Sequence, residues 1–450
     1  MRKLLIANRG EIAVRIIRTA RDMGLETVVV VSEPDRDSMA AGAADESVLV
    51  GPAPATASYL NHDAVLRAAL DSGCDAVHPG YGFLSENAAF ARKVVDAGLT
   101  WVGPDPSAIE LMGNKSRARA AAQDAGVPIL RGTDGPLEPD DDALALAWDI
   151  GFPLVVKASA GGGGRGIRFV NHESELLASI ETARGEAASV FGDGAVYLER
   201  FVELARHVEV QILGDGERYI HLGDRDCSMQ RRSQKVLEEA PAPDLPHHVR
   251  DVIRESSVEL ARRCGYRGAG TVEFLYDPVR EEAAFIEMNT RLQVEHPITE
   301  EITGVDIVRE QLRIAAGEGL SLSQDDVVFS GHAIELRLNA EDPHKNFFPS
   351  PGTITRLAWP TGEGIRVDTG VVEGSVVAPF YDSMLAKLIV HADTREEAIA
   401  RLLAALEHTH VEGIATTMPF HKLLLSRPEF AAVEHHSKFI ETTDGILEAL

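Results

Sequence analysis

Short apolar runs alternate with helical patterns along the first hundred residues. The runs that predict β-strands are 3–7, 27–32, 47–50, 76–78 and 100–102. Between the first two, apolar residues from Ile12 to Met23 recur at helical spacing, which predicts an amphipathic helix. Because strands that alternate with helices form parallel sheets, this region is expected to be α/β. Asn8-Arg9-Gly10-Glu11 stands where a dinucleotide fold has its glycine pattern, so NAD binding is not expected.

A second unit follows a connector rich in Gly, Pro and Asp at 132–142. A strand at 154–157 leads into four consecutive glycines, and an extended pattern resumes at 167–170. Further predicted strands are 195–199, 207–213, 219–223, 270–276 and 283–288, with helices around 247–264 and 305–316. The last hundred residues are expected to be α+β, with strands near 332–338, 352–358 and 385–390 and a helix after a capping box at Thr394 and Glu397.

The composition is that of a soluble globular chain with an acidic surplus. The 450 residues include 70 Asp and Glu against 44 Lys and Arg, a formal net charge of −26. Such a surface repels phosphate backbones and anionic lipids, so neither nucleic acid nor a membrane is expected as a partner. Three cysteines without a CxxC spacing, no signal-peptide pattern and no apolar run of the roughly 18 residues of a membrane span predict a cytoplasmic protein.

An anionic substrate would need local clusters of Lys and Arg on such a chain, and two windows provide them. The glycines at 161–164 offer backbone N–H groups that can fold closely over phosphates, and Lys157, Arg165 and Arg168 lie beside them with no acid in 157–168. A flexible surface hairpin is the alternative interpretation. The second window, 225–235, has four cations against one acid, and a solvated face is its alternative.

Polar groups occupy every odd position from Glu287 to Glu295. In an extended chain these side chains would face one side, but Glu287 and Glu295 would then be about 26 Å apart, too far for one metal ion. Either the chain bends, or Glu287 and Asn289 hold a metal while Arg291, Gln293 and Glu295 serve a second reactant. A neighbouring strand offers a further carboxylate, and such oxygen donors suit Mg²⁺ or Mn²⁺. A solvent-facing polar strand is the third interpretation.

These stretches resemble the biotin carboxylase family of ATP-grasp enzymes almost from end to end. The motifs that carry the resemblance are IANRGEIAVRI (6–16), HPGYGFLSEN (78–87), MGNK (112–115), KASAGGGGRG (157–166), RDCSMQRRSQK (225–235), EEAPAP (238–243), FIEMNTRLQVEHPITE (285–300), LNAED (338–342) and YDSM (381–384). The resemblance implies a Rossmann-like pre-ATP-grasp domain at 1–112, an ATP-grasp domain at 113–330 with a lid at about 131–202, and a C-terminal domain at 331–450.

The implied reaction is ATP-dependent carboxylation of biotin on a carrier protein, with bicarbonate as the carbon source and carboxyphosphate as the intermediate, the first half-reaction of an acyl-CoA carboxylase. By resemblance, the residues that would bind ATP are Lys115, Lys157, Gly163, Gly164, Glu199, Arg200, Phe201, Val202, His207 and Gln230. Glu273, Glu287 and Asn289 would hold Mg²⁺ or Mn²⁺ at the phosphates, as phosphoryl transfer requires.

The resemblance also assigns the second reactant. The bicarbonate residues would be Lys235, Arg291, Gln293 and the Val294 backbone, with Glu295 as the base. Arg337 would stabilise the biotin enolate; Tyr81 and Asp382 are weaker assignments, since Tyr81 also suits a core position. Ser233 replaces a histidine that many bacterial relatives have near the phosphates, and a modest effect on ATP affinity is expected.

The implied partners are a biotin carboxyl carrier protein or domain, a carboxyltransferase subunit and a second copy of the chain. No biotin-attachment sequence of the A/V-M-K-M type occurs, so the carrier is expected on another polypeptide or domain. Two alternative functions stay open at this point. One is another ATP-grasp ligase that activates a carboxylate or carbamate, and the other is a nucleotide-binding regulator without turnover.

Overall fold

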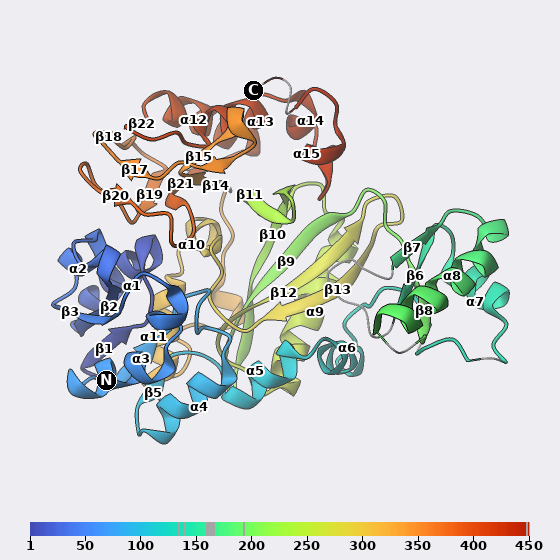
Figure 1. The fold of residues 1–450 in the computed structure, drawn as a ribbon, viewed down its shortest axis with the longest axis horizontal. Helices are drawn as coiled ribbons and strands as arrows, with labels where there is room; N and C mark the ends of the chain where they lie inside the picture. The colour runs from blue at the N-terminus through green and yellow to red at the C-terminus, as the bar shows by residue number, and fades with distance from the viewer. Residues whose placement is uncertain (134, 139, 159–166, 192–193, 447–448, 450) are drawn as a thin grey trace.

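The structure is a computed structural model that describes the chain except residues 134, 139, 159–166, 192–193, 447–448 and 450. The glycine loop, including Gly163 and Gly164, lies outside the described residues. Figure 1 shows a blue N-terminal unit, a green lobe that stands apart on the right, and a long central sheet that continues into the orange and red C-terminal region.

The N-terminal unit is a parallel sheet covered by helices. Its strands, in the order β3-β2-β1-β4-β5, are β1 (Lys3–Ile6), β2 (Glu26–Ser32), β3 (Glu46–Gly51), β4 (Ala76–His78) and β5 (Thr100–Trp101). The helices that accompany them are α1 (Gly10–Asp22), α2 (Met39–Ala43), α3 (His62–Asp71), α4 (Ala88–Asp96) and α5 (Pro106–Gly113). The next helix, α6 (Lys115–Asp124), packs against the central sheet. Every strand pairing of the N-terminal sheet is parallel, and α1 buries Ile12 and Ile16 in the core beneath it, as the pattern predicts.

The separate lobe carries the strands on either side of the glycine loop. Its antiparallel sheet has the order β7-β6-β8, formed by β6 (Leu154–Ala158), β7 (Ile167–Val170) and β8 (Val196–Arg200). Two helices, α7 (Ala143–Ile150) and α8 (Glu173–Phe191), pack on it. The two connections to the body run side by side, because the Arg200 N–H donates to the Arg131 carbonyl at 2.9 Å.

The central sheet is antiparallel and has eight strands in the order β13-β12-β9-β10-β11-β14-β21-β19. They are β9 (Arg206–Asp215), β10 (Tyr219–Arg231), β11 (Gln234–Ala240), β12 (Arg267–Asp277), β13 (Glu282–Asn289), β14 (His332–Asn339), β19 (Ile365–Thr369) and β21 (Met384–Ala392). The helices α9 (His247–Arg263), α10 (His296–Thr303) and α11 (Ile307–Ala315) pack against it. Because β11 pairs with β14, one sheet joins the middle of the chain to the C-terminal region.

The C-terminal region adds helices and short strands to that sheet. The helices are α12 (Arg395–Glu407), α13 (Met418–Leu425), α14 (Pro428–Ala431) and α15 (Phe439–Thr442). The short strands are β15 (Glu341–Asp342), β16 (Phe348–Pro349), β17 (Gly352–Thr353), β18 (Arg356–Ala358), β20 (Val376–Val377) and β22 (His410–Glu412). The expected N-cap of α12 is confirmed, since the Thr394 hydroxyl accepts from the Glu397 N–H at 3.2 Å.

Two local expectations were wrong. The strand expected at 219–223 continues to Arg231 and pairs with β11, so the cationic window lies on a hairpin and Arg225 is fully buried. The expected strand at 352–358 is split between β17 and β18.

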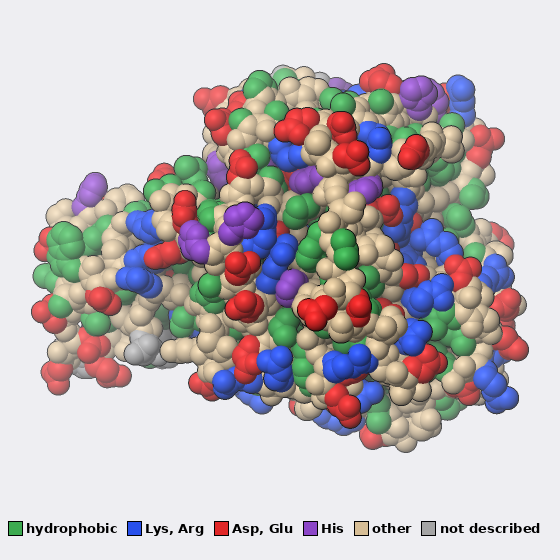
Figure 2. Space-filling view, turned by 180° about the vertical axis from the view of Figure 1, so that it is seen from behind, with side chains coloured by type: hydrophobic (Ala, Val, Ile, Leu, Met, Phe, Trp, Pro, Cys, Tyr) green, Lys and Arg blue, Asp and Glu red, His purple; other side chains and the backbone are tan. Residues whose placement is uncertain are grey.

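The surface carries both signs of charge. Figure 2, seen from behind, shows acidic and basic side chains interspersed over this face. No helix in the described part of the chain is both long and apolar enough to cross a membrane.

Candidate active site

Three carboxylates line up across adjacent strands of the central sheet. Glu273 on β12 is in register with Glu287 on β13 and with Glu209 on β9. Residues in register on neighbouring strands share one face, which places the three carboxylates in a row. Glu287 and Glu273 are among the residues expected here, but sequence reasoning missed Glu209. The sequence offered only a weak indication of Glu209, because it is a single acid in an apolar strand, two residues after His207.

Lys235 on β11 joins these acids to Glu295. Its Nζ lies 2.7 Å from Glu209 Oε2, 3.2 Å from Glu273 Oε1 and 2.6 Å from Glu295 Oε1. Burial would by itself raise the pKa of Glu273, but Lys235 and His207 outweigh it and hold that pKa below its usual range. Lys235 and His207 therefore keep the buried Glu273 carboxylate ionised.

Arg225 holds Glu209 in place from the other side. Its fully buried guanidinium pairs with Glu209 Oε1 at 2.6 Å and also donates to Gln211, Thr271 and Thr299. These four partners are themselves buried, so Arg225 supports the site and does not face an incoming anion. Two residues of the second cationic window therefore contact the carboxylate row: Arg225 pairs with Glu209, and Lys235 pairs with Glu209 and Glu273.

Glu295 lies between two cations. Its Oε1 accepts from Lys235, and its Oε2 accepts from Arg337 Nη2 at 3.0 Å. Burial would raise the pKa of Glu295, but Lys235, Arg337 and Arg225 hold it well below its usual range. The Glu295 carboxylate is 1% exposed and ionised, so it can accept a proton. Lys235 and Arg337 donate to it and fix its orientation.

The chain bends after Asn289, where β13 ends, so the extended reading of the odd-numbered residues was wrong beyond that point. Gln293 Nε2 returns to donate to Glu273 Oε1 at 3.0 Å, and Asn289 Nδ2 donates to the same oxygen at 2.8 Å. Arg291 bridges the bend, since it donates to Asn289 Oδ1 and to Gln293 Oε1 at 2.8 Å each. The bend removes the 26 Å separation that a straight strand would impose.

Among the described residues expected to bind ATP, Lys157 and Glu199 lie on strands of the lobe, and His207 and Gln230 lie on β9 and β10 of the central sheet. Lys157 forms an ion pair with Glu199, and Gln230 Nε2 lies 2.9 Å from His207 Nδ1. Burial and Glu273 raise the pKa of Glu287, and Lys115 lies close enough to oppose that shift. Phe201 stacks edge-on against Phe169 of the lobe at 4.9 Å.

Arg200 and Val202 differ from the other ATP residues. The Arg200 guanidinium donates to the Ile150 carbonyl and pairs with Glu282 at 2.7 Å. It therefore points into the base of the lobe, away from Lys235. Val202 lines a cavity of about 300 Å³ behind the two connections.

The residues expected to contact biotin have different partners in the structure. The Tyr81 hydroxyl donates to Glu11, and its carbonyl accepts from Asn8 Nδ2 at 2.7 Å. Arg337 instead pairs with Glu238 and Glu295. Asp382, 61% exposed, lies 3.8 Å from Arg9 at the edge of the N-terminal unit.

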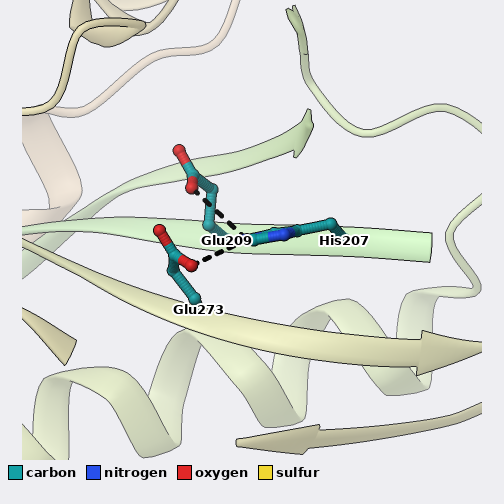
Figure 3. Close-up of side chains that lie close together, drawn as sticks. All are labelled: His207, Glu209 and Glu273. Atoms are coloured by element: carbon teal, nitrogen blue, oxygen red, sulfur yellow. Dashed lines mark ion pairs between the residues drawn. The ribbon is translucent and has the colours of Figure 1, made fainter. Parts of the chain in front are cut away.

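The acid row suits a divalent cation. Burial raises the pKa of Glu287, and repulsion from the negative charge of Glu273 raises it further. A bound cation would remove that repulsion. Ligand atoms of His207, Glu209 and Glu273 also lie within 4.8 Å of one another, as Figure 3 shows. In this structure His207 Nε2 is 2.9 Å from Glu273 Oε2 and 3.9 Å from Glu209 Oε2. Carboxylate and amide oxygens at this position fit Mg²⁺ or Mn²⁺.

Glu238, beneath Arg337, predicts a pH-dependent stability. Burial raises its pKa from 4.5 to about 7, although Arg337 acts against the shift. Between these values the folded state keeps a proton that the unfolded state has lost, so the free energy of unfolding falls as pH rises, by about 3 kcal/mol from this group. Glu238→Gln should remove that slope in urea denaturation between about pH 5 and about pH 7. Glu396→Gln, on exposed α12, should keep it; an unchanged slope in E238Q would contradict the assignment.

Family models match most of the chain. Residues 1–109 match the biotin carboxylase N-terminal domain, and residues 335–442 match the biotin carboxylase C-terminal domain. Residues 114–323 match the ATP-binding domain of the carbamoyl-phosphate synthase L chain. The three matches follow one another in the order in which the sequence motifs occur.

Relatives are similar over nearly the whole chain. Biotin carboxylase 1 of Bacillus subtilis is 50% identical over 445 residues, and biotin carboxylase of Pseudomonas aeruginosa is 52% identical over 448 residues; each match covers 99% of both chains.

Solved structures have the same fold. The biotin carboxylase domain of a thermophilic 2-oxoglutarate carboxylase, bound to ADP, superposes with a TM-score of 0.94 at 45% identity over 99% of both chains. The corresponding domain dimer from Hydrogenobacter thermophilus, in complex with MgADP and bicarbonate, has a TM-score of 0.85 at 45% identity, over 99% of this chain and 98% of that one. The expected α/β fold is confirmed, and the chain belongs to the biotin carboxylase family of ATP-grasp ligases.

Proposed function

We propose that this chain carboxylates biotin on a carrier protein or domain, with ATP and bicarbonate as the other substrates. The observation that carries the proposal is Glu295, a buried ionised carboxylate held between Lys235 and Arg337 beside the acid row. A base between two cations suits a small anion that must lose a proton before it reacts.

ATP would enter between the lobe and the central sheet. Lys115, Lys157 and His207 would contact it, and the loop with Gly163 and Gly164 would cover its phosphates. Glu273, Glu287 and Asn289 would hold Mg²⁺ or Mn²⁺, which neutralises charge on the phosphates when bound. Glu209 and His207 lie close enough to Glu273 to join that set.

Bicarbonate would lie on the other side of Lys235. Lys235, Arg291, Gln293 and the Val294 backbone would orient it, and Glu295 would take its proton. The resulting oxygen nucleophile attacks the γ-phosphorus of ATP and forms carboxyphosphate and ADP. Carboxyphosphate then breaks down to CO₂ and phosphate. The released phosphate would take the proton of the biotin ureido nitrogen, which then bonds to the CO₂. Arg337, which lies close enough to Tyr81 to act on its pKa, would stabilise the biotin enolate formed in this step.

The partners follow from this chemistry. A biotin carboxyl carrier protein or domain would present the biotin, and a carboxyltransferase would select the acyl acceptor. The dimer named for the Hydrogenobacter thermophilus domain supports a homodimer for this chain as well.

ATP hydrolysis, measured with and without bicarbonate and free biotin, tests the proposal. We expect ADP release to depend on bicarbonate and to increase with biotin. ATP cleavage that ignores both additions would favour another ATP-grasp ligase. Nucleotide binding without any cleavage would favour a regulator.

A further inference from the structure

Lys387 is a fully buried lysine that the proposed chemistry does not use. It lies on β21 with its side chain 0% exposed, and its Nζ donates to the Val294 carbonyl at 2.8 Å. Glu11 Oε2, from the first turn of α1, lies 3.4 Å away, and Asp368 is in register with Lys387 on the neighbouring strand β19. Because a buried cation is costly unless it is paired, its position is strongly constrained.

The preceding carbonyl is held in the same way. His296, also fully buried, places Nδ1 2.8 Å from the Gln293 carbonyl. A carbonyl oxygen only accepts, so Nδ1 carries the proton in this contact. His296 therefore holds the Gln293 carbonyl, and Lys387 holds the Val294 carbonyl, each through a buried side chain.

These contacts orient backbone donors toward the site. In a planar trans peptide the N–H points opposite to the C=O. Holding the Gln293 carbonyl therefore aims the Val294 N–H, and holding the Val294 carbonyl aims the Glu295 N–H and the base attached to it. We propose that Lys387 and His296 form a two-point clamp on Val294, and that this clamp positions the backbone donor and the base for bicarbonate.

The clamp joins three parts of the chain. Lys387 comes from the C-terminal region, Val294 from the loop before α10, and Glu11 from the N-terminal unit, where the Tyr81 hydroxyl also contacts it. Figure 1 shows α10 between α1 and β21, at the place where these units meet. A small planar anion offers few contacts, so the position of each donor matters more for it than for ATP. The inference rests on the proposed function and adds positioning residues to that site.

Lys387→Met tests the clamp, because methionine fills the space but cannot donate. We expect its KM for bicarbonate to rise about tenfold, while its KM for ATP stays within about twofold of wild type. Hydrogen exchange of the backbone at 290–297 should become faster, a readout that needs no turnover. The double variant E11Q/K387M removes the buried charge imbalance and should behave in the same way. Lys422→Met, at an ion pair on α13, is the matched control.

The results of these measurements distinguish failure of the clamp from failure of the proposed function. A folded E11Q/K387M protein with unchanged bicarbonate KM would overturn the clamp. A parallel rise of both KM values would also overturn it, since it would indicate a general structural role. If wild type shows no dependence on bicarbonate but K387M still exchanges faster at 290–297 than K422M, the proposed function fails and the backbone clamp is supported.

Discussion

Replacing Glu295 by glutamine is expected to lower bicarbonate-dependent ATP cleavage by about 10² to 10⁴-fold, the range for loss of a general base. Glutamine has nearly the same shape but cannot take a proton. Its amide nitrogen would also face either Lys235 or Arg337, each of which now donates to a carboxylate oxygen. The reaction and the orientation of the anion would therefore both suffer.

ATP binding should persist in this variant, because the side chain of Glu295 contacts Cys227, Lys235 and Arg337, which all lie outside the lobe. Nucleotide binding by calorimetry and ADP release with bicarbonate, measured on the same preparation, separate the two effects. Glu396→Gln, on the exposed first turn of α12, should retain wild-type cleavage. Loss of ATP binding together with cleavage would show that Glu295 has a structural role.

Replacing Lys235 by methionine should have the second large effect. Three buried carboxylates share this cation, and breaking a buried pair costs about 3–5 kcal/mol because the partners are left uncompensated. We expect destabilisation of that size at neutral pH and a loss of at least about a hundredfold in bicarbonate-dependent cleavage, as Lys235 also orients the anion.

The pH dependence of this destabilisation has a defined sign. Lys235 helps to depress the pKa values of Glu273 and Glu295, so its stabilisation is present above their unfolded values and is lost as pH falls toward the folded ones. The difference in unfolding free energy between wild type and K235M should therefore shrink at acid pH. Lys93→Met, at an exposed pair with Asp63, should change little. A difference that is independent of pH would contradict the role of Lys235.

The sequence predicted best the elements whose stability is local. The apolar spacing from Ile12 to Met23 describes α1, and the parallel strands before and after it follow from short apolar runs. The strand β10 was underestimated because Asp224, Arg225 and Asp226 interrupt its apolar pattern. These residues are buried in the structure and paired with groups distant in the chain, such as Glu209 and Arg206.

Motif resemblance named most of the site, but the contacts within it came from packing. Glu273 and Glu287 were expected to lie together, and the register of β12 and β13 places them so. Glu209 was missed, since one acid in a strand has no special spacing. The bend after Asn289 was one of two open readings, and it depends on partners from β12 that no local pattern specifies.

The sequence by itself determined the α/β plan, the family and the residue types that the chemistry needs, because periodicity and motifs are encoded within short stretches of chain. Only the tertiary structure decided that Lys235 balances three carboxylates, that Arg225 is a buried support, and that Lys387 holds the backbone at Val294. The physical reason is burial: the cost of placing charge away from water is met by partners from distant strands, and only the folded chain brings those partners together.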